Sequence, residues 1–262
     1  MKFNFRIIIL LLLLFLIFSW CNSYIKESFN NYGNLYSQEK IPKVIISTYH
    51  TKSKIPDKVF SNIQRYAYNY KFKIFDDSEI IIFLKKYYSP SVLETFKKLK
   101  GAHKADLFRY CYLYKFGGIY LDIKTELIKN IDDVFNIENV DLYTVLSMHK
   151  GTVYQGIIAS KPNNHLFKEL IDYMVSIDKP VKRYFAFTAD FYRRLQKYCN
   201  KKVITPGYNK TIHGKNFYLF QEKCTRRKCD CKDGLDRYKR CCHVYNGFRK
   251  VIKTRYADYP WK

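Results

Sequence analysis

The 262-residue sequence predicts one α/β domain that follows an apolar N-terminal segment. Short β-branched runs alternate with longer segments in which apolar residues recur at helical spacing, as in an α/β chain. Hydrophobic residues make up 47% of the chain and aromatic residues 18%, which excludes a disordered chain. The remaining length suits one sizeable core, so a second full domain is not expected.

The first residues have the pattern of a targeting signal. Lys2 and Arg6 precede the uncharged run 7–18, which is shorter than the roughly 20 residues of a typical spanning helix. A signal peptide and a signal anchor over 1–24 both stay open, and the anchor is favoured because no small-x-small cleavage site follows. We expect a single-pass membrane protein whose domain faces the lumen of an ER- or Golgi-type compartment. If the segment is cleaved, the protein is secreted.

The elements of the domain can be placed in chain order. A polar stem is expected over 25–40 and the folded domain over 41–262. Strands are predicted at 43–49, 71–75, 119–123, 142–146, 156–160 and 217–220. Helices are predicted at 56–69, 79–87, 92–100, 102–116 and 165–177, with Ser78 and Ser91 as caps of the second and third. Beyond Arg183 the pattern is irregular.

The chain is strongly basic. Lys and Arg total 47 against 23 acidic residues, a formal net charge of +24. Such a surface attracts polyanions, anionic lipid heads or phosphorylated substrates, although biased residue composition is an equal alternative explanation. The basic residues form no single stripe and show no nucleic-acid module signature, so no specific nucleic-acid partner is expected.

Eight cysteines fit a lumenal domain, because disulfides persist in oxidising compartments. Five of them lie in a cysteine-rich excursion over 224–243, namely Cys224, Cys229, Cys231, Cys241 and Cys242. Their spacing is unlike that of familiar zinc sites, so disulfides are favoured, with zinc and free thiols as alternatives. Asn209 begins an acceptor sequon for N-glycosylation if the domain is lumenal.

Charged residues gather in the segment 105–126. Asp106 and Arg109 lie three apart on one predicted helix face, and after a diglycine turn Asp122 and Lys124 lie two apart on one predicted strand face. Spacing alone also allows an ordinary helical ion pair and a solvated strand edge. The same groups suit glycosyl transfer, in which cations neutralise a departing diphosphate and carboxylates orient sugar hydroxyls.

The segment resembles glycosyltransferase family 32, which includes initiating mannosyltransferases and inositolphosphoceramide mannosyltransferases. The family pattern (S/A)-D-x-x-R-Y-x-x-L-x-x-x-G-G-x-Y-x-D-x-D is matched by Ala105, Asp106, Arg109, Tyr110, Leu113, Gly117, Gly118, Tyr120 and Asp122. Similarity extends over roughly 41–177. The resemblance implies a GT-A fold, with a Rossmann-like mixed sheet flanked by helices. It also implies retaining transfer of a hexose from a UDP- or GDP-sugar to a glycan, glycolipid or protein acceptor.

The resemblance also assigns residue roles. Asp106, Arg109 and Asp122 are the catalytic candidates, and Asp122 is the first acid of the metal-binding D-x-D. The donor-binding candidates are Tyr49, Asp106, Arg109, Gly118, Tyr120, Asp122 and Lys124.

The pattern is broken where its second acid is expected, because Lys124 stands there. Asp122 and Glu126 are the candidate ligands of Mn2+ or Mg2+, while Lys124 is the alternative means of neutralising the diphosphate. An inactive relative is a third possibility. The rival function is a catalytically inactive membrane protein that binds polyanions or glycans.

Overall fold

The structure is a computed structural model that describes residue 19 and residues 40–177, 183–225 and 241–256. Residues 41–262 form one compact unit and residues 1–40 another. The apolar run 7–18 and residues 25–39 of the predicted stem lie outside the described residues. Within those residues, no helix combines the length and the apolar character needed to cross a bilayer.

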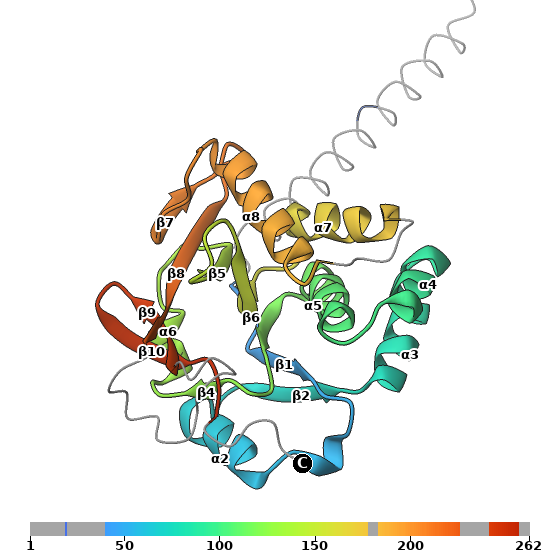
Figure 1. The fold of residues 1–262 in the computed structure, drawn as a ribbon, viewed down its shortest axis with the longest axis horizontal. Helices are drawn as coiled ribbons and strands as arrows, with labels where there is room; N and C mark the ends of the chain where they lie inside the picture. Colours follow the sequence, from blue (N-terminus) through green and yellow to red (C-terminus); the bar gives the residue numbers. More distant parts are fainter. Residues whose placement is uncertain (1–18, 20–39, 178–182, 226–240, 257–262) are drawn as a thin grey trace, which may run out of the picture. The chain divides into compact units, whose positions relative to one another are not determined.

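In the described part of the chain, ten strands form one mixed sheet (Figure 1). Along the sheet the order is β2, β1, β3, β6, β5, β8, β9, β10 and β4, and β7 pairs with β8. β1 is parallel to β2 and β3, and β5 is parallel to β8, whereas the other pairs are antiparallel. The bounds are β1 Val44–Thr48, β2 Lys71–Phe75, β3 Gly118–Leu121, β4 Glu126–Leu127, β5 Leu142–Leu146, β6 Val153–Ser160, β7 Gly207–Lys210, β8 Asn216–Thr225, β9 Cys241–Asn246 and β10 Arg249–Lys253.

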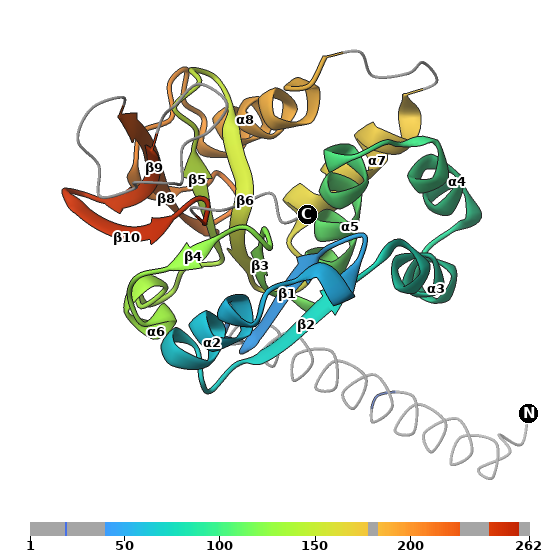
Figure 2. The ribbon, with the colours of Figure 1, turned by 60° about the horizontal axis from the view of Figure 1, so that its bottom comes forward.

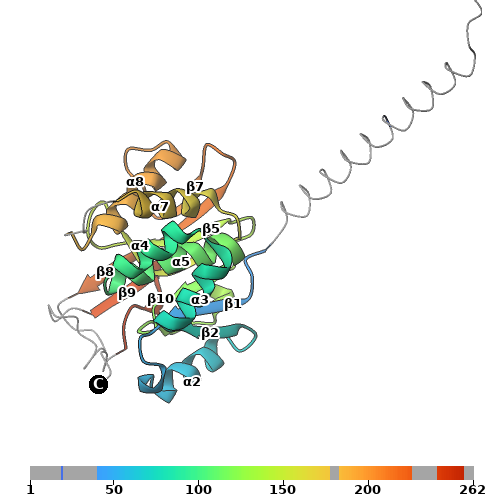
Figure 3. The ribbon, with the colours of Figure 1, turned by 90° about the vertical axis from the view of Figure 1, so that its right-hand side faces the viewer.

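Helices cover both faces of the sheet, which confirms the α/β class (Figure 2). The bounds are η1 Lys52–Lys54, α2 Asp57–Tyr66, α3 Asp77–Tyr87, α4 Pro90–Lys98, α5 Ala102–Phe116, α6 Ile131–Val134, α7 His165–Ser176 and α8 Ala186–Cys199. Side chains of β1 alternate between the faces: Ile46 packs in the core with α5, and Ile45 packs in the core with α2 and α6. α5 and α7 lie side by side (Figures 1 and 3).

α5 is buried all round through its middle. All eight residues from Asp106 to Leu113 are buried, because α4 and α7 flank a helix that already packs on the sheet. Toward its end the helix reaches the surface, where Phe116 is 39% exposed. The charged pair on this helix is therefore inside the protein and must be compensated by partners.

α8 was missed by the sequence prediction, which expected irregular chain beyond Arg183. Its inward face carries Phe187, Phe191 and Leu195, all buried at four-residue spacing. The signal was present, but polar and basic residues between these positions obscured it.

Both predicted helix caps are also wrong. Instead of Ser78, the side chain of Asp76 caps α3, accepting from the Glu79 amide at 3.0 Å, and the Glu79 carboxylate accepts from the Asp76 amide. α4 begins after Ser89 rather than Ser91.

One disulfide lies among the described residues. Cys224 and Cys242, which face each other across β8 and β9, are bonded. Cys229 and Cys231 lie outside the described residues. The sequon residue Asn209 is 1% exposed, and its amide donates to two backbone carbonyls, so a folded chain does not present it as a glycan acceptor.

Candidate active site

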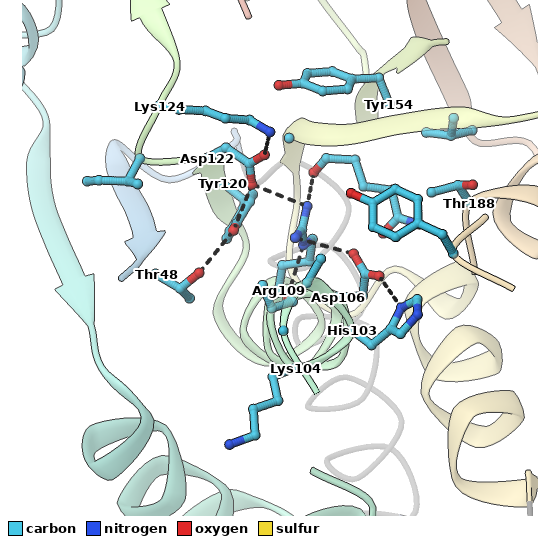
Figure 4. Close-up of a pocket in the computed structure, with 18 of the residues that line it drawn as sticks. Thr48, His103, Lys104, Asp106, Arg109, Tyr120, Asp122, Lys124, Tyr154 and Thr188 are labelled. Carbon is cyan, nitrogen blue, oxygen red and sulfur yellow. Dashed lines mark hydrogen bonds and ion pairs between the residues drawn. The ribbon is translucent and has the colours of Figure 1, made fainter. Parts of the chain in front are cut away.

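A cleft of about 1330 Å³ opens at the edge of the sheet where β1 and β3 end (Figure 4). Because these strands are parallel neighbours, Tyr49 after β1 and Asp122 after β3 lie at the same edge. β6 runs antiparallel to β3, so its first half adds Gln155 to the wall. The amino-terminal half of α5 contributes Asp106 and Arg109.

A two-glycine turn makes this arrangement possible. Gly117 and Gly118 both have positive φ, 64° and 103°, and reverse the chain between α5 and β3. A Cβ on Gly118 would lie 2.8 Å from the carbonyl oxygen of Val44, so only glycine lets β3 start this close to β1. The reversal returns Asp122 to the end of the sheet at which α5 begins.

Arg109 is the centre of the cluster. Its side chain is 4% exposed and lies 3.3 Å from the Asp106 carboxylate and 3.7 Å from the Asp122 carboxylate. The guanidinium also donates to the Gln155 carbonyl and stacks 4.2 Å from the centre of the Tyr120 ring. The structure thus brings together the three charged groups that the sequence singled out.

Both oxygens of Asp122 have partners. Oδ1 accepts from the Tyr120 hydroxyl at 3.0 Å and lies near Arg109, while Oδ2 lies 3.3 Å from the Lys124 ammonium. Burial alone would raise the pKa of Asp122. The positive charges of Lys124 and Arg109 outweigh burial and hold this pKa below its usual value. Asp122 is therefore ionised at neutral pH.

Lys124 reaches Asp122 through a turn rather than along a strand. β3 ends at Leu121, so the predicted placement of both residues on one strand face is wrong. The Thr125 amide donates to the Asp122 carbonyl at 2.8 Å, and this turn folds the ammonium back toward the carboxylate. Lys124 also lies 5.9 Å from the Tyr154 ring. The interactions with Tyr154 and Asp122 raise the pKa of Lys124, which stays charged.

Gly156 leaves the space that this arrangement needs. A Cβ at this position would lie 2.5 Å from the Tyr154 hydroxyl and 2.7 Å from Oδ2 of Asp122. The Gly156 carbonyl also accepts from the Asp122 amide at 2.8 Å, which fixes the backbone of the acid. Because glycine has no side chain, β6 can approach Asp122 this closely at Gly156.

The other predicted site residues divide into two groups. Tyr49 and Tyr120 line the cleft with Asp106, Arg109, Asp122 and Lys124. Gly118 and Glu126 are not among the residues that line it. Gly118 packs against β1, and Glu126 lies on β4, 2.9 Å from the Lys253 ammonium on β10.

The sequence did not predict the wall of the cleft that β6 forms. β6 was predicted to begin at Gly156, so Tyr154 and Gln155 were left outside it. His103 was also missed, although it lies one turn before Asp106, and its Nδ1 is 3.3 Å from the Asp106 carboxylate. Tyr184 and Phe185 also line the cleft, and the Tyr184 ring lies 6.2 Å from the ring of His103.

A group of possible metal ligands lies at another part of the cleft wall. Atoms of Glu222, Cys224 and Cys242 lie within 4.8 Å of one another. Because the two cysteines are bonded to each other, they offer no thiolates to a metal. The zinc alternative is therefore not supported by this pair.

The fold and the cleft define a class of protein. Buried acids, a guanidinium and an ammonium converge at the carboxyl ends of strands in an α/β sheet, where such proteins bind ligands that carry hydroxyls and negative charge. Residues 32–141 match the family described as "Glycosyltransferase sugar-binding region containing DXD motif". This match supports the family expected from the sequence.

Two curated proteins are similar to part of the chain. An uncharacterized glycosyltransferase of Acanthamoeba polyphaga mimivirus is 33% identical over 42% of this chain and 44% of its own length. The initiation-specific alpha-1,6-mannosyltransferase of Saccharomyces cerevisiae is 32% identical over 48% of this chain and 28% of its own. The chain thus spans less than half of either relative.

Solved structures give weaker similarity. The PaToxG glycosyltransferase has a TM-score of 0.43 and 14% identity, over 68% of this chain and 76% of that one. A glycosyltransferase involved in the glycosylation of the major capsid of PBCV-1 has a TM-score of 0.36 and 13% identity, over 67% and 80% of the two chains.

Proposed function

We propose that this protein transfers a hexose from a UDP- or GDP-sugar to a glycan, glycolipid or protein acceptor, on a GT-A-type fold. The observation that carries the proposal is the Asp106–Arg109–Asp122 cluster at the end of β3, inside a cleft large enough for a nucleotide sugar. The match to a glycosyltransferase family supports the same reaction class.

The cluster assigns different roles to its charged groups. Asp122 is 21% exposed and Lys124 31% exposed as side chains, so both can touch a bound donor. Arg109 is 4% exposed and engaged on several sides, so we assign it to positioning the two carboxylates. Asp122 and Asp106 would accept hydrogen bonds from sugar hydroxyls, and Lys124 would face the diphosphate.

The nucleotide would lie along the end of β1. Tyr49 lines the cleft there, and the ring of His50 lies 4.7 Å from the Tyr49 ring. These aromatic rings offer a stacking surface for the base. Tyr184 and Phe185, which also line the cleft, would then face the acceptor. Retention at the sugar carbon is proposed from the resemblance to family 32, and NMR of the product anomer tests it.

We also propose that the domain faces an oxidising lumen and that the N-terminal segment holds it at a membrane. The Cys224–Cys242 disulfide supports the compartment, since such bonds persist where thiols are not kept reduced. The uncharged run 7–18, preceded by Lys2 and Arg6, supports the membrane segment. Carbonate extraction and protease protection of the full chain in microsomes test both statements.

The enzymatic proposal is tested by donor turnover. The full chain is incubated with a panel of UDP- and GDP-sugars, with Mn2+ and separately with EDTA, and release of UDP or GDP is measured. Asp122→Asn should lower the rate by about 100-fold or more, because it removes a charge that orients the donor. Asp141→Asn is the matched control, since Asp141 is a buried acid 3.2 Å from Lys161 and does not line the cleft.

Equal rates for wild type and Asp122→Asn, with every donor, would refute the assignment of the site. No turnover of any donor, with retained binding to a glycan or polyanion, would favour the non-enzymatic alternative.

A further inference from the structure

The position of the Lys124 ammonium determines how the site can bind a negatively charged group. It lies 3.3 Å from Oδ2 of Asp122, and the Lys124 side chain is 31% exposed. Its side chain is mostly buried, and the ammonium lies near the Tyr154 ring. The cation is thus held in place by an acid and an aromatic face rather than moving freely in solvent.

A divalent ion does not fit the same place. Mg2+ and similar ions take several oxygen ligands at about 2.0–2.6 Å, supplied mainly by free carboxylates. Asp122 is the one acid at this point among the described residues lining the cleft, and two cations already lie beside its oxygens. An ion bound there would face the Lys124 and Arg109 charges at short range.

The other acids near the cluster are engaged as well, including Glu222, whose carboxylate accepts from the Ser147 hydroxyl and the Met148 amide. Asp106 lies against Arg109 and His103, and Asp77 pairs with Lys104. Glu126, the second metal ligand predicted from the sequence, pairs with Lys253. These residues therefore do not assemble the oxygen set that a D-x-D metal site requires.

We infer that the Lys124 ammonium takes the place of the divalent ion, so that donor binding and transfer need no metal. This inference rests on the proposed function. In the transfer, the bond between the sugar carbon and the diphosphate oxygen breaks with its electron pair on that oxygen. The acceptor oxygen bonds to the carbon, and its proton passes to the departing diphosphate. Lys124 keeps its own proton throughout and donates hydrogen bonds to the diphosphate oxygens.

The test uses UDP and GDP as probes of the full chain. Calorimetric titrations are run in EDTA and repeated with Mn2+. We expect the better-bound of the two to bind in EDTA, with a Kd that Mn2+ changes by less than about threefold. Binding that needs Mn2+ overturns the inference while leaving the proposed transferase intact. Absence of binding under both conditions overturns the inference and the proposed function together.

Variants at position 124 distinguish the loss of the positive charge from a general destabilisation of the fold. Lys124→Met should weaken binding in EDTA by about tenfold or more, because a charged donor to the diphosphate is lost, whereas Lys124→Arg should retain most of it. Lys71→Met, on exposed β2, removes the same charge outside the cleft and should bind as wild type.

Lys124→Asp restores the second acid of the family pattern and gives a sharper result. Its nucleotide binding should become dependent on Mn2+, and Mn2+ electron paramagnetic resonance should detect a bound ion that the wild type lacks. Unchanged affinity of Lys124→Met in EDTA, or a bound Mn2+ in the wild type, would overturn the inference. Thermal unfolding of each variant identifies any that fail to fold.

Discussion

The substitution Gly156→Ala probes how tightly the cleft is built around Asp122. The new Cβ would lie 2.7 Å from Oδ2 of the acid, whereas ordinary contact begins at 3.4 Å, so the carboxylate or β6 must move by about 0.7 Å. The Tyr154 hydroxyl, at 2.5 Å, must move as well. Overpacking of this kind destabilises a fold by roughly 1–3 kcal/mol. For a domain of this size, each kcal/mol lowers the Tm by about 2–4 °C.

The functional effect of Gly156→Ala should exceed its effect on stability. A misplacement near 1 Å lowers turnover by about 100-fold, so a shift of this size should lower it by tenfold or more. The assay pairs thermal unfolding with nucleotide titration and donor turnover. Gly214→Ala is the matched control: its φ is +71°, so alanine is strained, but nothing lies within 4 Å and the residue is outside the cleft. Wild-type binding and turnover in Gly156→Ala, or an equal loss in both variants, would refute the reasoning.

Three further predictions follow from the buried charges and the disulfide. Arg109→Met leaves Asp106 and Asp122 without their shared partner and should lower the free energy of unfolding by about 3–5 kcal/mol in urea denaturation; a loss below 1 kcal/mol would contradict the shared pairing. Replacing Cys224 and Cys242 together by serine should destabilise the domain by about 3 kcal/mol, since the bond spans 18 residues, and dithiothreitol should then lower the Tm of the wild type more than that of the variant. Because folding lowers the pKa of Asp122 from its usual value, its stabilising contribution is fully present above that usual value and is lost as the pH falls through the folded pKa. The Tm difference between wild type and Asp122→Asn should accordingly be constant from about pH 5 to 7 and shrink in more acidic buffer; shrinkage already near neutral pH would contradict the lowered pKa.

The sequence predicted those parts of the site in which contacts follow local spacing. Asp106 and Arg109 are neighbours on any helix, and the glycine turn places the next acid near them, so this cluster was recognisable before the fold was known. The wall of the cleft formed by β6 could not be recognised from the sequence, because Gln155 and Gly156 reach the cleft only through the antiparallel pairing of β6 with β3. That pairing joins segments more than thirty residues apart.

The difference between local spacing and contacts that depend on the fold also explains why Lys124 and Glu126 were placed incorrectly. Lys124 was expected on a strand because Ile123 continues the apolar run, but the chain turns at Asp122 once the edge of the sheet is reached. Glu126 follows the motif closely in sequence, yet its partner Lys253 comes from the far end of the chain. The end of β3 decided the position of Lys124, and pairing with a distant segment decided that of Glu126.

Arg109 places a constraint on how this protein can diverge. Its guanidinium interacts with both Asp106 on α5 and Asp122 after β3. A substitution at either acid therefore changes the electrostatic environment of the other. Substitutions at the three positions should be strongly non-additive. Homologues that retain the site would then keep Asp106, Arg109 and Asp122 together or lose all three together. A substitution at one of these positions alone would be tolerated only if other substitutions compensated for it.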